Sequence, residues 1–340
     1  MRKLYFLLPG TTSKFFCGGL WAELKTLKLA QQVCPAEIVT YRQREKEHLW
    51  LEDLLQANDA TQALKEVIFV LCWGFDVAKL APKLKSFNAI YHAHSAGYGF
   101  HLPPHIPIVT VSRNTLGYWG QRSPHALLYY LPNEISDPFQ NHNGVRDIDV
   151  LVMARKSSHY LMKQLVPALQ GRCRLEVVDY YVEDLSVLFN RAKIYLYDSA
   201  EYWAIQGISE GFGLQPMEAL ACGCQVFSSV NHGLSDYLDP GFNSYKIAGY
   251  ATGFDVQRIL QAIQNFEQSP LVLSPHILAE YRSDNIIRRL EVILKDLNAF
   301  FDYKQSQVSD IPDLNIWQIT KRRSQRVFKK LQKFLPFLLK

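Results

Sequence analysis

The sequence has no long apolar run and few cysteines. No uncharged apolar stretch approaches 18 residues, so we expect no membrane span. The apolar stretch Leu4–Leu8 ends at Pro9–Gly10 and is too short for a secretory signal. The six cysteines form no C-x-x-C pair, and Cys222–Gly223–Cys224 alone is too short to hold zinc. We therefore expect the cysteines to be free thiols in a reducing compartment, which predicts a cytoplasmic protein.

Acidic side chains are missing from the last 20 residues. Residues 321–340 (KRRSQRVFKKLQKFLPFLLK) hold eight of the 37 Lys and Arg. The rest of the chain then has 29 basic against 32 acidic residues. A mildly acidic body argues against nucleic-acid binding, which usually needs a basic folded surface. With 48% hydrophobic residues, the chain is also too apolar to be largely disordered.

The basic tail has helical periodicity. Its apolar residues recur at spacings of four, three and four, at Val327, Leu331, Phe334 and Leu338. A basic amphipathic helix of this kind can lie on an anionic membrane. It can equally dock on the protein body with its lysines in solvent. The first interpretation adds peripheral attachment to the inner face of the membrane, and both stay open.

Strand patterns alternate with helix patterns along most of the chain, which predicts mostly parallel sheets. In the first half we expect strands at Lys3–Leu8, Glu37–Tyr41, Val67–Leu71, Asn88–Ala93 and Ile108–Val111. In the second half we expect strands at Asp149–Ala154, Leu175–Asp179, Lys193–Tyr197 and Gln225–Ser228. Helices are expected over residues 20–30, Ser158–Gln170, Leu214–Cys222, Asp255–Asn265 and from Ser283 onward.

A segment rich in turn-forming residues separates the two halves. Residues 132–144 (PNEISDPFQNHNG) contain two Pro, a Gly and several Asn, Asp and Ser, as linkers do. We therefore expect an α/β protein with doubly wound domains at 1–131 and 145–300. An extension at 301–340 carries the basic tail. A cleft between two such domains is the natural ligand site.

The most informative stretch is Ser209–Glu218, SEGFGLQPME. Gly211 and Gly213 permit a tight turn and close approach of a ligand to the backbone. Free amides at the helix start favour an anion, and a diphosphate is the anion we expect. The carboxylates of Glu210 and Glu218 can face the same ligand, and a carboxylate can accept both hydroxyls of a ribose. An ordinary strand–turn–helix with two solvated acids is the alternative.

This stretch resembles the retaining GT-B glycosyltransferases of family 4, the glycosyl transferases group 1 type. Their signature is E-G-F-G-x-x-x-x-E followed by small residues and a short strand, and residues 210–226 (EGFGLQPMEALACGCQV) match it throughout. The following His232–Asp236 is similar to the family's glycine loop with an acidic residue. The resemblance implies two Rossmann-like domains facing a cleft, with 1–131 on the acceptor side and 145–300 binding a nucleotide sugar.

The resemblance also implies an activity. A sugar, of the hexosyl type, would move from a nucleotide diphosphate sugar to the hydroxyl of a saccharide or lipid-linked acceptor. The family works with retention and without a metal or cofactor, often in cell-surface polysaccharide or glycolipid synthesis. A nucleotide-sugar epimerase on the same fold is one alternative. A catalytically silent sugar-nucleotide-binding or membrane-adaptor protein is another.

Residue roles follow from the same resemblance. Glu210 would contact the donor sugar, His94 would lie near the reacting sugar, and Arg155 would neutralise the leaving diphosphate, which makes these three the expected catalytic residues. The expected donor-binding set is Gly18, Gly19, Arg155, Lys156, Gly211, Phe212, Gly213, Leu214 and Glu218. The family places its Lys several residues after the Arg, so either Lys156 or Lys163 can serve here.

The sequence contains two motifs that resemble metal sites. His92 and His94 are two apart and share one strand face. A zinc site with His101 or His105 is one alternative for them, but two Pro and the lack of a nearby carboxylate argue against it. A structural histidine packed at the strand end is the other alternative. Asp147-Ile-Asp149 imitates the D-x-D motif of metal-dependent transferases. It immediately precedes a buried strand, so we interpret it as polar edge residues.

Overall fold

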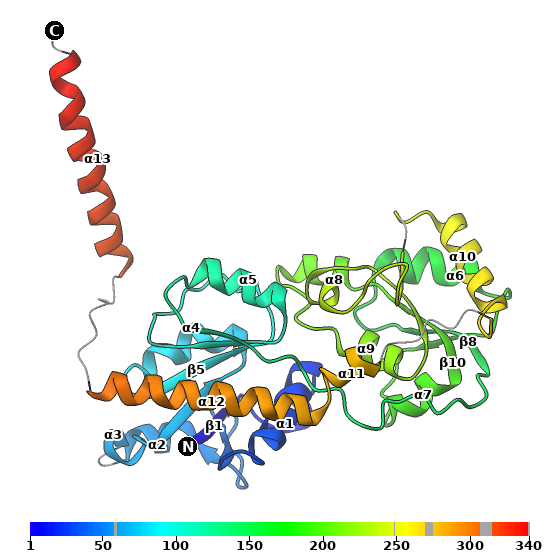
Figure 1. Ribbon diagram of the computed structural model, residues 1–340, viewed down its shortest axis with the longest axis horizontal. Helices are drawn as coiled ribbons and strands as arrows, with labels where there is room; N and C mark the ends of the chain where they lie inside the picture. Colours follow the sequence, from blue (N-terminus) through cyan, green and yellow to red (C-terminus); the bar gives the residue numbers. More distant parts are fainter. Residues whose placement is uncertain (58–59, 248, 269–274, 307–314, 339–340) are drawn as a thin grey trace. The chain divides into compact units, whose positions relative to one another are not determined.

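A computed structural model describes residues 1–57, 60–247, 249–268, 275–306 and 315–338. Side chains are described within these ranges except for Pro275 and residues 330–338. The chain divides into two compact units, Met1–Asn298 and Ala299–Lys340 (Figure 1).

The first unit begins with a seven-stranded parallel sheet in the order β3-β2-β1-β4-β5-β6-β7. We call this sheet and its helices the first lobe. Its strands are β1 (Lys3–Leu8), β2 (Ala36–Thr40), β3 (Leu49–Trp50), β4 (Val67–Leu71), β5 (Asn88–Ala93), β6 (Ile108–Thr110) and β7 (Leu128–Tyr130). Its helices are η1 (Ser13–Phe15), α1 (Gly18–Ala30), α2 (Leu51–Gln56), α3 (Ala60–Ala63), α4 (Gly74–Lys83) and α5 (Arg113–Arg122).

A five-stranded parallel sheet follows in the order β12-β11-β10-β8-β9, and it forms the second lobe. Its strands are β8 (Ile148–Met153), β9 (Leu175–Val178), β10 (Ala192–Tyr197), β11 (Gln225–Ser228) and β12 (Tyr245–Lys246). Its helices are η2 (Leu161–Leu165), α6 (Val166–Leu169), α7 (Leu185–Arg191), α8 (Ala200–Gln206), α9 (Leu214–Ala221), η3 (His232–Asp236), α10 (Thr252–Gln264) and α11 (Pro275–Ala279).

The central strands are buried on both faces of each sheet. Every residue of β4, β5 and β8 is buried, as expected for parallel sheets. The nine predicted strands are confirmed, with ends that differ by at most one residue. Their near-continuous apolar runs made them recognisable, whereas β3 and β12 have two residues each and carry no such signal.

The helix predicted over Ser158–Gln170 differs in kind. The structure has a π-helical turn at Leu161–Leu165 before α6, in which the Val166 amide donates to the carbonyl of Leu161. Pro167 follows directly in α6. Because proline has no N–H, it cannot continue the regular i to i−4 ladder, and the turn widens just before it.

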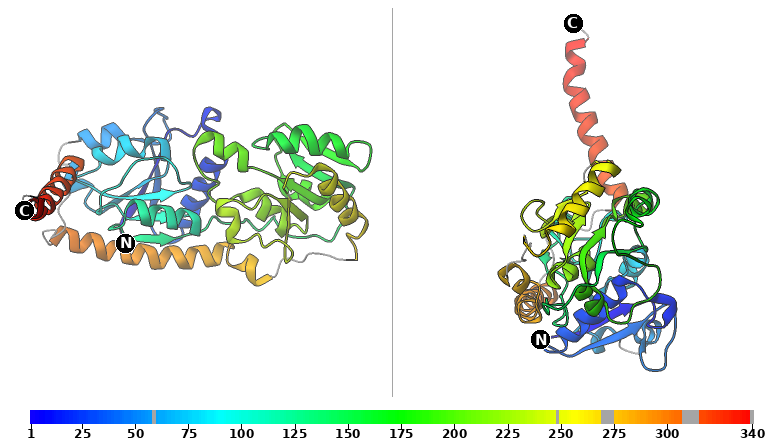
Figure 2. Two further views of the ribbon diagram at one scale, coloured as in Figure 1. Left: turned by 90° about the horizontal axis from the view of Figure 1, so that it is seen from above. Right: turned by 90° about the vertical axis from the view of Figure 1, so that its right-hand side faces the viewer.

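The lobes are joined twice. Residues 131–147, between β7 and β8, contain neither helix nor strand and include the predicted linker. The chain then returns through α12 (Ser283–Ser306), whose residues up to Asn298 lie along the first lobe (Figures 1 and 2). There the Arg2 amide donates to Asn298 Oδ1 at 3.0 Å. The predicted domain boundaries stay predictions.

The second unit contains the end of α12 and the helix α13 (Ile316–Leu338). Trp317, Val327 and Phe328 are exposed on α13. The side chains of Leu331, Phe334 and Leu338, which completed the predicted apolar stripe, lie outside the described residues. Within the described part of the chain, no helix is both long and apolar enough to cross a membrane.

Candidate active site

Glu210 lies buried at the turn between α8 and α9. Its Oε2 accepts hydrogen bonds from the Tyr197 hydroxyl, the Ser199 hydroxyl at 3.0 Å and Trp203 Nε1 at 2.6 Å. Its other oxygen, Oε1, has no hydrogen-bond partner among the described residues and is not sealed from solvent. One oxygen therefore anchors the carboxylate, and the other is available to a ligand.

The glycines of this turn are required by crowding. A Cβ on Gly211 would lie 1.6 Å from the backbone oxygen of His94. Gly213 has φ +78° and is the N-cap of α9, and its Cβ would lie 2.2 Å from Leu234 Cδ2. Only glycine fits either position. The side chain of Phe212 is buried between Tyr237 and Tyr281, so only its backbone can face a ligand.

Two basic residues follow β8 beside this turn. Arg155 is exposed and has no ion pair within the described chain. Lys156 is partly buried, with Nζ 4.6 Å from the centre of the Trp203 ring. Burial lowers the pKa of Lys156, and nearby Glu210 opposes that shift. Its backbone is left-handed, with φ +68°, a conformation that costs a non-glycine residue about 1–3 kcal/mol. Lys163 is exposed on η2.

Glu218 lies on α9 and is buried near another acidic side chain, Glu134. Burial raises its pKa to about 7; Lys25 lowers it and Glu134 raises it. The Lys25 ammonium lies 3.8 Å from Glu134 Oε2. Burial is the main cause that raises the pKa of Tyr195, and Glu218 and Glu210 both raise it further. The two carboxylates thus flank one buried tyrosine.

Loops from the two lobes meet at this turn. The Ser95 hydroxyl donates to the carbonyl of Ser209 at 2.6 Å, and the Ala96 amide donates to the Ser209 hydroxyl at 3.0 Å. The Arg113 amide, at the start of α5, donates to Asp236 Oδ2 at 2.8 Å. The segment after β5, including His94, therefore lies against the Glu210 turn.

The glycine loop of the first lobe forms the start of α1. Cys17 is the N-cap and its side chain makes no capping hydrogen bond. Gly18 is exposed, and a Cβ there would meet nothing within 4 Å. Open space above unpaired amides at a helix start suits an anion.

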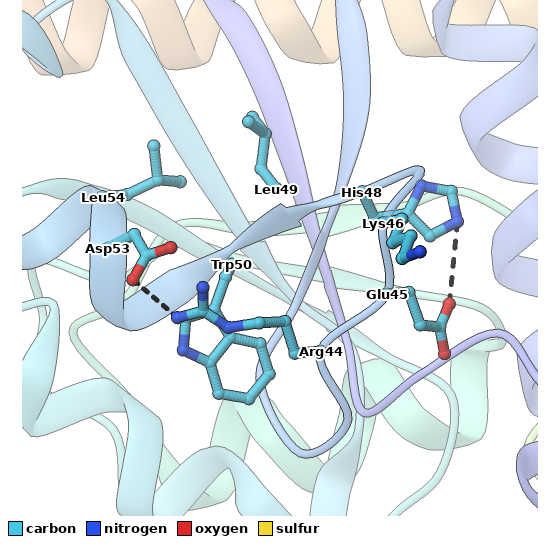
Figure 3. A pocket seen from close by; sticks show the side chains of 8 residues that line it. All are labelled: Arg44, Glu45, Lys46, His48, Leu49, Trp50, Asp53 and Leu54. Atoms are coloured by element: carbon cyan, nitrogen blue, oxygen red, sulfur yellow. Dashed lines mark hydrogen bonds and ion pairs between the residues drawn. The ribbon is translucent and has the colours of Figure 1, made fainter.

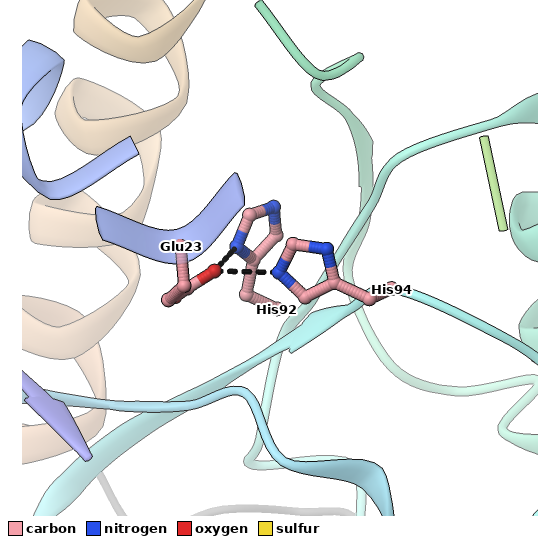
Figure 4. Close-up of side chains that lie close together, drawn as sticks. All are labelled: Glu23, His92 and His94. Atoms are coloured by element: carbon pink, nitrogen blue, oxygen red, sulfur yellow. Dashed lines mark hydrogen bonds and ion pairs between the residues drawn. The ribbon is translucent and has the colours of Figure 1, made fainter. Parts of the chain in front are cut away.

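A carboxylate that the sequence did not suggest reaches the histidines. Glu23 of α1 contacts both His92 of β5 and His94 just after it (Figure 4). Among the described residues these three are the one group of three or more metal-ligating side chains that converge. His101 Nδ1 instead lies 3.1 Å from the carbonyl of Arg122.

An open pocket of about 580 Å³ lies beside β3 in the first lobe (Figure 3). The guanidinium of Arg44 lies 5.4 Å from the centre of the Trp50 ring and pairs with Asp53 at 2.7 Å. The lining side chains combine one aromatic ring with charges of both signs, from Arg44, Glu45, Lys46, His48, Leu49, Trp50, Asp53 and Leu54.

Residues 150–283 match the protein family described as Glycosyl transferases group 1. The matched segment spans β8 to the start of α12 and includes the whole Glu210–Glu218 turn. Residues 150–283 are therefore similar to a glycosyl transferases group 1 domain. No curated protein matches the chain in sequence.

Solved glycosyltransferase structures share the fold. The pneumococcal O-GlcNAc transferase GtfA in complex with UDP and GlcNAc has a TM-score of 0.65 at 9% identity, covering 87% of this chain and 99% of that one. Anabaena HepE in complex with UDP and glucose has a TM-score of 0.62 at 14% identity, covering 87% of this chain and 100% of that one. Sucrose-phosphate synthase from Thermosynechococcus elongatus has a TM-score of 0.61 at 13% identity, covering 88% of this chain and 100% of that one. The predicted GT-B fold is confirmed.

The candidate site includes residues that the sequence did not point to. Trp203 on α8 anchors Glu210, and Lys25 and Glu134 surround Glu218. Glu134 lies in the predicted linker between the domains, which predicts a loop residue and not a site residue. Glu23 contacts histidines about 70 positions away, a separation that no local pattern reports.

The two carboxylates of the D-x-D motif form ion pairs within the second lobe. Asp147 pairs with Arg191 at 2.6 Å. Asp149 accepts from Arg174 at 2.8 Å and pairs with Lys193 at 3.1 Å. Arg174 and Lys193 hold the pKa of Asp149 well below its usual range, against the effect of burial. Both carboxylates are therefore committed to ion pairs of the second lobe.

Proposed function

We propose that the protein transfers a hexosyl-type sugar from a nucleotide diphosphate sugar to an acceptor hydroxyl, with retention and without a metal ion. The observation that carries this proposal is the state of Glu210. Three donors hold its Oε2, and Oε1 is left for a ligand beside the backbone of His94. A fixed carboxylate oxygen is suited to orient a sugar hydroxyl.

The nucleotide half of the donor would lie along α9. Glu218 would accept the ribose hydroxyls, and the amides of Gly211–Leu214 would hold the diphosphate together with the Gly18–Gly19 loop. UDP is the first nucleotide to test, because GtfA and HepE were both solved with UDP. The open space above Gly18 supports the approach of a phosphate to that backbone.

Catalysis would rest on charge and position. The transition state of glycosyl transfer is oxocarbenium-like, and negative charge grows on the leaving diphosphate. The exposed guanidinium of Arg155 is free to receive that charge. Lys156 is the better second cation than Lys163, because it already lies within electrostatic reach of Glu210.

The acceptor would lie on the first lobe. Exposed aromatic rings follow the carboxyl ends of its strands: Phe16 and Trp21 after β1, 5.0 Å apart, and Phe75 after β4, 5.0 Å from Tyr98. Rings in such a position can stack on sugar faces or on a lipid chain. They support a saccharide or lipid-linked acceptor, as in cell-surface polysaccharide or glycolipid synthesis.

The helix α13 would attach the enzyme to an anionic membrane surface on the cytoplasmic side. Residues 321–340 have eight basic and no acidic side chains, and each basic residue near such a surface contributes about 1 kcal/mol. The exposed Trp317, Val327 and Phe328 supply apolar contacts. This attachment would bring the enzyme to a lipid-linked acceptor.

The roles of the two glutamates give the test. Glu210→Ala should lower turnover about 100-fold or more while donor affinity changes little, because its contact matters most at the reacting sugar. Glu218→Ala should weaken donor binding instead. Donor affinity by calorimetry and turnover by released nucleotide separate the two effects, and the reverse pattern would overturn these roles.

Two alternatives would appear in the same experiments. An epimerase would convert the donor sugar with no acceptor present. A silent sugar-nucleotide-binding protein would bind the donor, with Glu218 required, but would release no nucleotide with any acceptor. Measurement of both products from wild-type protein therefore decides between the three functions.

A further inference from the structure

Three side chains of the first lobe converge on one another: Glu23 and His92 are buried, and His94 is partly buried. Glu23 lies on the second turn of α1, His92 near the end of β5, and His94 immediately after that strand. Glu23 Oε2 lies 2.7 Å from His92 Nδ1 and 2.5 Å from His94 Nε2. Figure 4 shows both rings directed at this single oxygen.

The carboxylate is ionised and accepts from both rings. Burial raises the pKa of Glu23. His92, and after it His94, lower this pKa by more than burial raises it, to about 2. An ionised carboxylate can only accept hydrogen bonds, so each facing ring nitrogen carries the proton. Burial, followed by His92, lowers the pKa of His94 against the opposing effect of Glu23, which favours a neutral ring at pH 7.

These facts fix the tautomer of His94. A neutral imidazole has one N–H, and in His94 that N–H is on Nε2, held by Glu23. Nδ1 is then an acceptor with no partner among the described residues. The His94 side chain is 15% exposed, whereas that of His92 is 4% exposed and its Nε2 is buried without a partner. Only His94 therefore offers an accessible acceptor.

Hydrogen bonding explains the group better than a metal site does. Zinc ligands lie about 2.0–2.1 Å from the ion, which places tetrahedral ligand atoms roughly 3.3 Å apart. The separations of 2.5 and 2.7 Å from Glu23 Oε2 are hydrogen-bond lengths. Both rings also share one oxygen instead of surrounding a common point.

We propose that Glu23 is a positioning residue: it fixes His94 so that Nδ1 accepts a hydrogen bond from a hydroxyl of the donor sugar, with His92 holding the same carboxylate in place. The sugar hydroxyl rests on the proposed function. The location is supported by the backbone, because the carbonyl of His94 abuts Gly211 and the next residue donates to Ser209. An imidazole acceptor and Glu210 Oε1 would then flank one sugar ring.

The first test needs no donor. Nitrogen-15 NMR of the full chain with labelled histidine should show His94 with Nε2 protonated and Nδ1 bare at pH 7, assigned by loss of its signals in His94→Gln. In Glu23→Gln the ring should lose this single tautomer. A protonated Nδ1 in wild-type protein would overturn the proposal even if the protein is a transferase.

The second test uses turnover of a bound nucleotide sugar. A lost hydrogen bond to a charged group corresponds to about 10- to 100-fold, so Glu23→Gln should lower kcat by that factor with little change in the donor KM. Asp76→Asn is the matched control, since Asp76 is also a buried carboxylate of the first lobe and accepts from Tyr41 and Arg42. It should leave the His94 tautomer and kcat unchanged.

The third test measures zinc binding. Chelated wild-type protein titrated with Zn²⁺ should show no stoichiometric shift of the His92 and His94 signals. Tight one-to-one binding lost in Glu23→Gln would make the group a metal site and overturn the positioning role. Unchanged tautomer and unchanged kcat in Glu23→Gln would reduce Glu23 to a structural residue.

Discussion

Glu210 lies on the turn before α9 and Glu218 on α9 itself, yet the two carboxylates have opposite surroundings. Glu210 receives three hydrogen bonds on one oxygen. Glu218 is buried beside Glu134, and its pKa rises to about 7. A ribose would supply the donors that Glu218 lacks, so donor binding should favour its ionised form.

Glu218 should make the unfolding free energy depend on pH. Its pKa is about 7 when folded and about 4.5 when unfolded, so the folded protein keeps a proton that the unfolded chain has lost between these values. Stability from this group is complete below pH 4.5 and is lost as pH rises through 7. Glu218→Gln does not titrate and should be more stable than wild type at pH 8 by up to about 3 kcal/mol.

Urea unfolding at pH 5 and pH 8 measures this difference. The gain from Glu218→Gln should be small at pH 5 and largest at pH 8. Glu267→Gln, at an exposed position, is the control and should show no such trend. An equal effect of Glu218→Gln at both pH values would contradict a buried, proton-holding carboxylate.

At the residue level, a sequence makes visible only chemistry that is local along the chain. The Glu210–Glu218 turn is contiguous, so its glycines, proline and carboxylates were visible together. Glu23 was not predictable, because it meets His92 and His94 only after β5 is placed beside α1 in the fold. Trp203 was missed because nothing in α8 marks its indole N–H as a partner of Glu210.

At the scale of elements, the segment after β5 and the turn before α9 meet backbone to backbone. Gly211 allows this contact, and Ser95 and Ser209 add hydrogen bonds across it. The strand runs that carry these loops were predictable from continuous apolar residues. The π-helical turn before Pro167 was not, since helical periodicity alone does not distinguish it from an α-helix.

Substitution of Gly211 should separate these elements. In Gly211→Ala the new Cβ meets the backbone oxygen of His94, which cannot move aside as a side chain can. We expect a loss of about 1–3 kcal/mol in unfolding free energy, together with loss of turnover. Gly253→Ala is the control, because a Cβ there meets nothing within 4 Å.

Denaturant unfolding and turnover of the two glycine variants provide the check. Gly253→Ala should match wild type in both. If Gly211→Ala were as stable and as active as wild type, the close contact between the two loops would play no part in the working enzyme.

At the scale of the whole molecule, two parallel sheets form one compact unit, and the basic tail belongs to another. The alternation of strands and helices predicted the two sheets. The return of α12 to the first lobe was not predictable, because its apolar spacing identifies a helix without naming the sheet it covers.

Deletion of residues 321–340 tests the role assigned to the tail. The truncated protein should lose flotation with vesicles of phosphatidylcholine and phosphatidylglycerol, because eight basic side chains are removed. Vesicles of phosphatidylcholine alone should bind neither protein. Donor affinity should not change, and equal flotation of both proteins with the anionic vesicles would remove the membrane proposal.

Donor-induced thermal stabilisation tests the proposed nucleotide-sugar site at Glu210 and Glu218. Wild type, Glu218→Ala and Glu267→Ala would be heated with UDP-, GDP-, ADP- and TDP-sugars in the presence of a chelator. A ligand at 100 times its Kd adds about 2.7 kcal/mol to stability. We predict that one nucleotide class, UDP first, stabilises wild type and Glu267→Ala but not Glu218→Ala. Stabilisation by none of the donors, or equal stabilisation of all three proteins, would contradict the account.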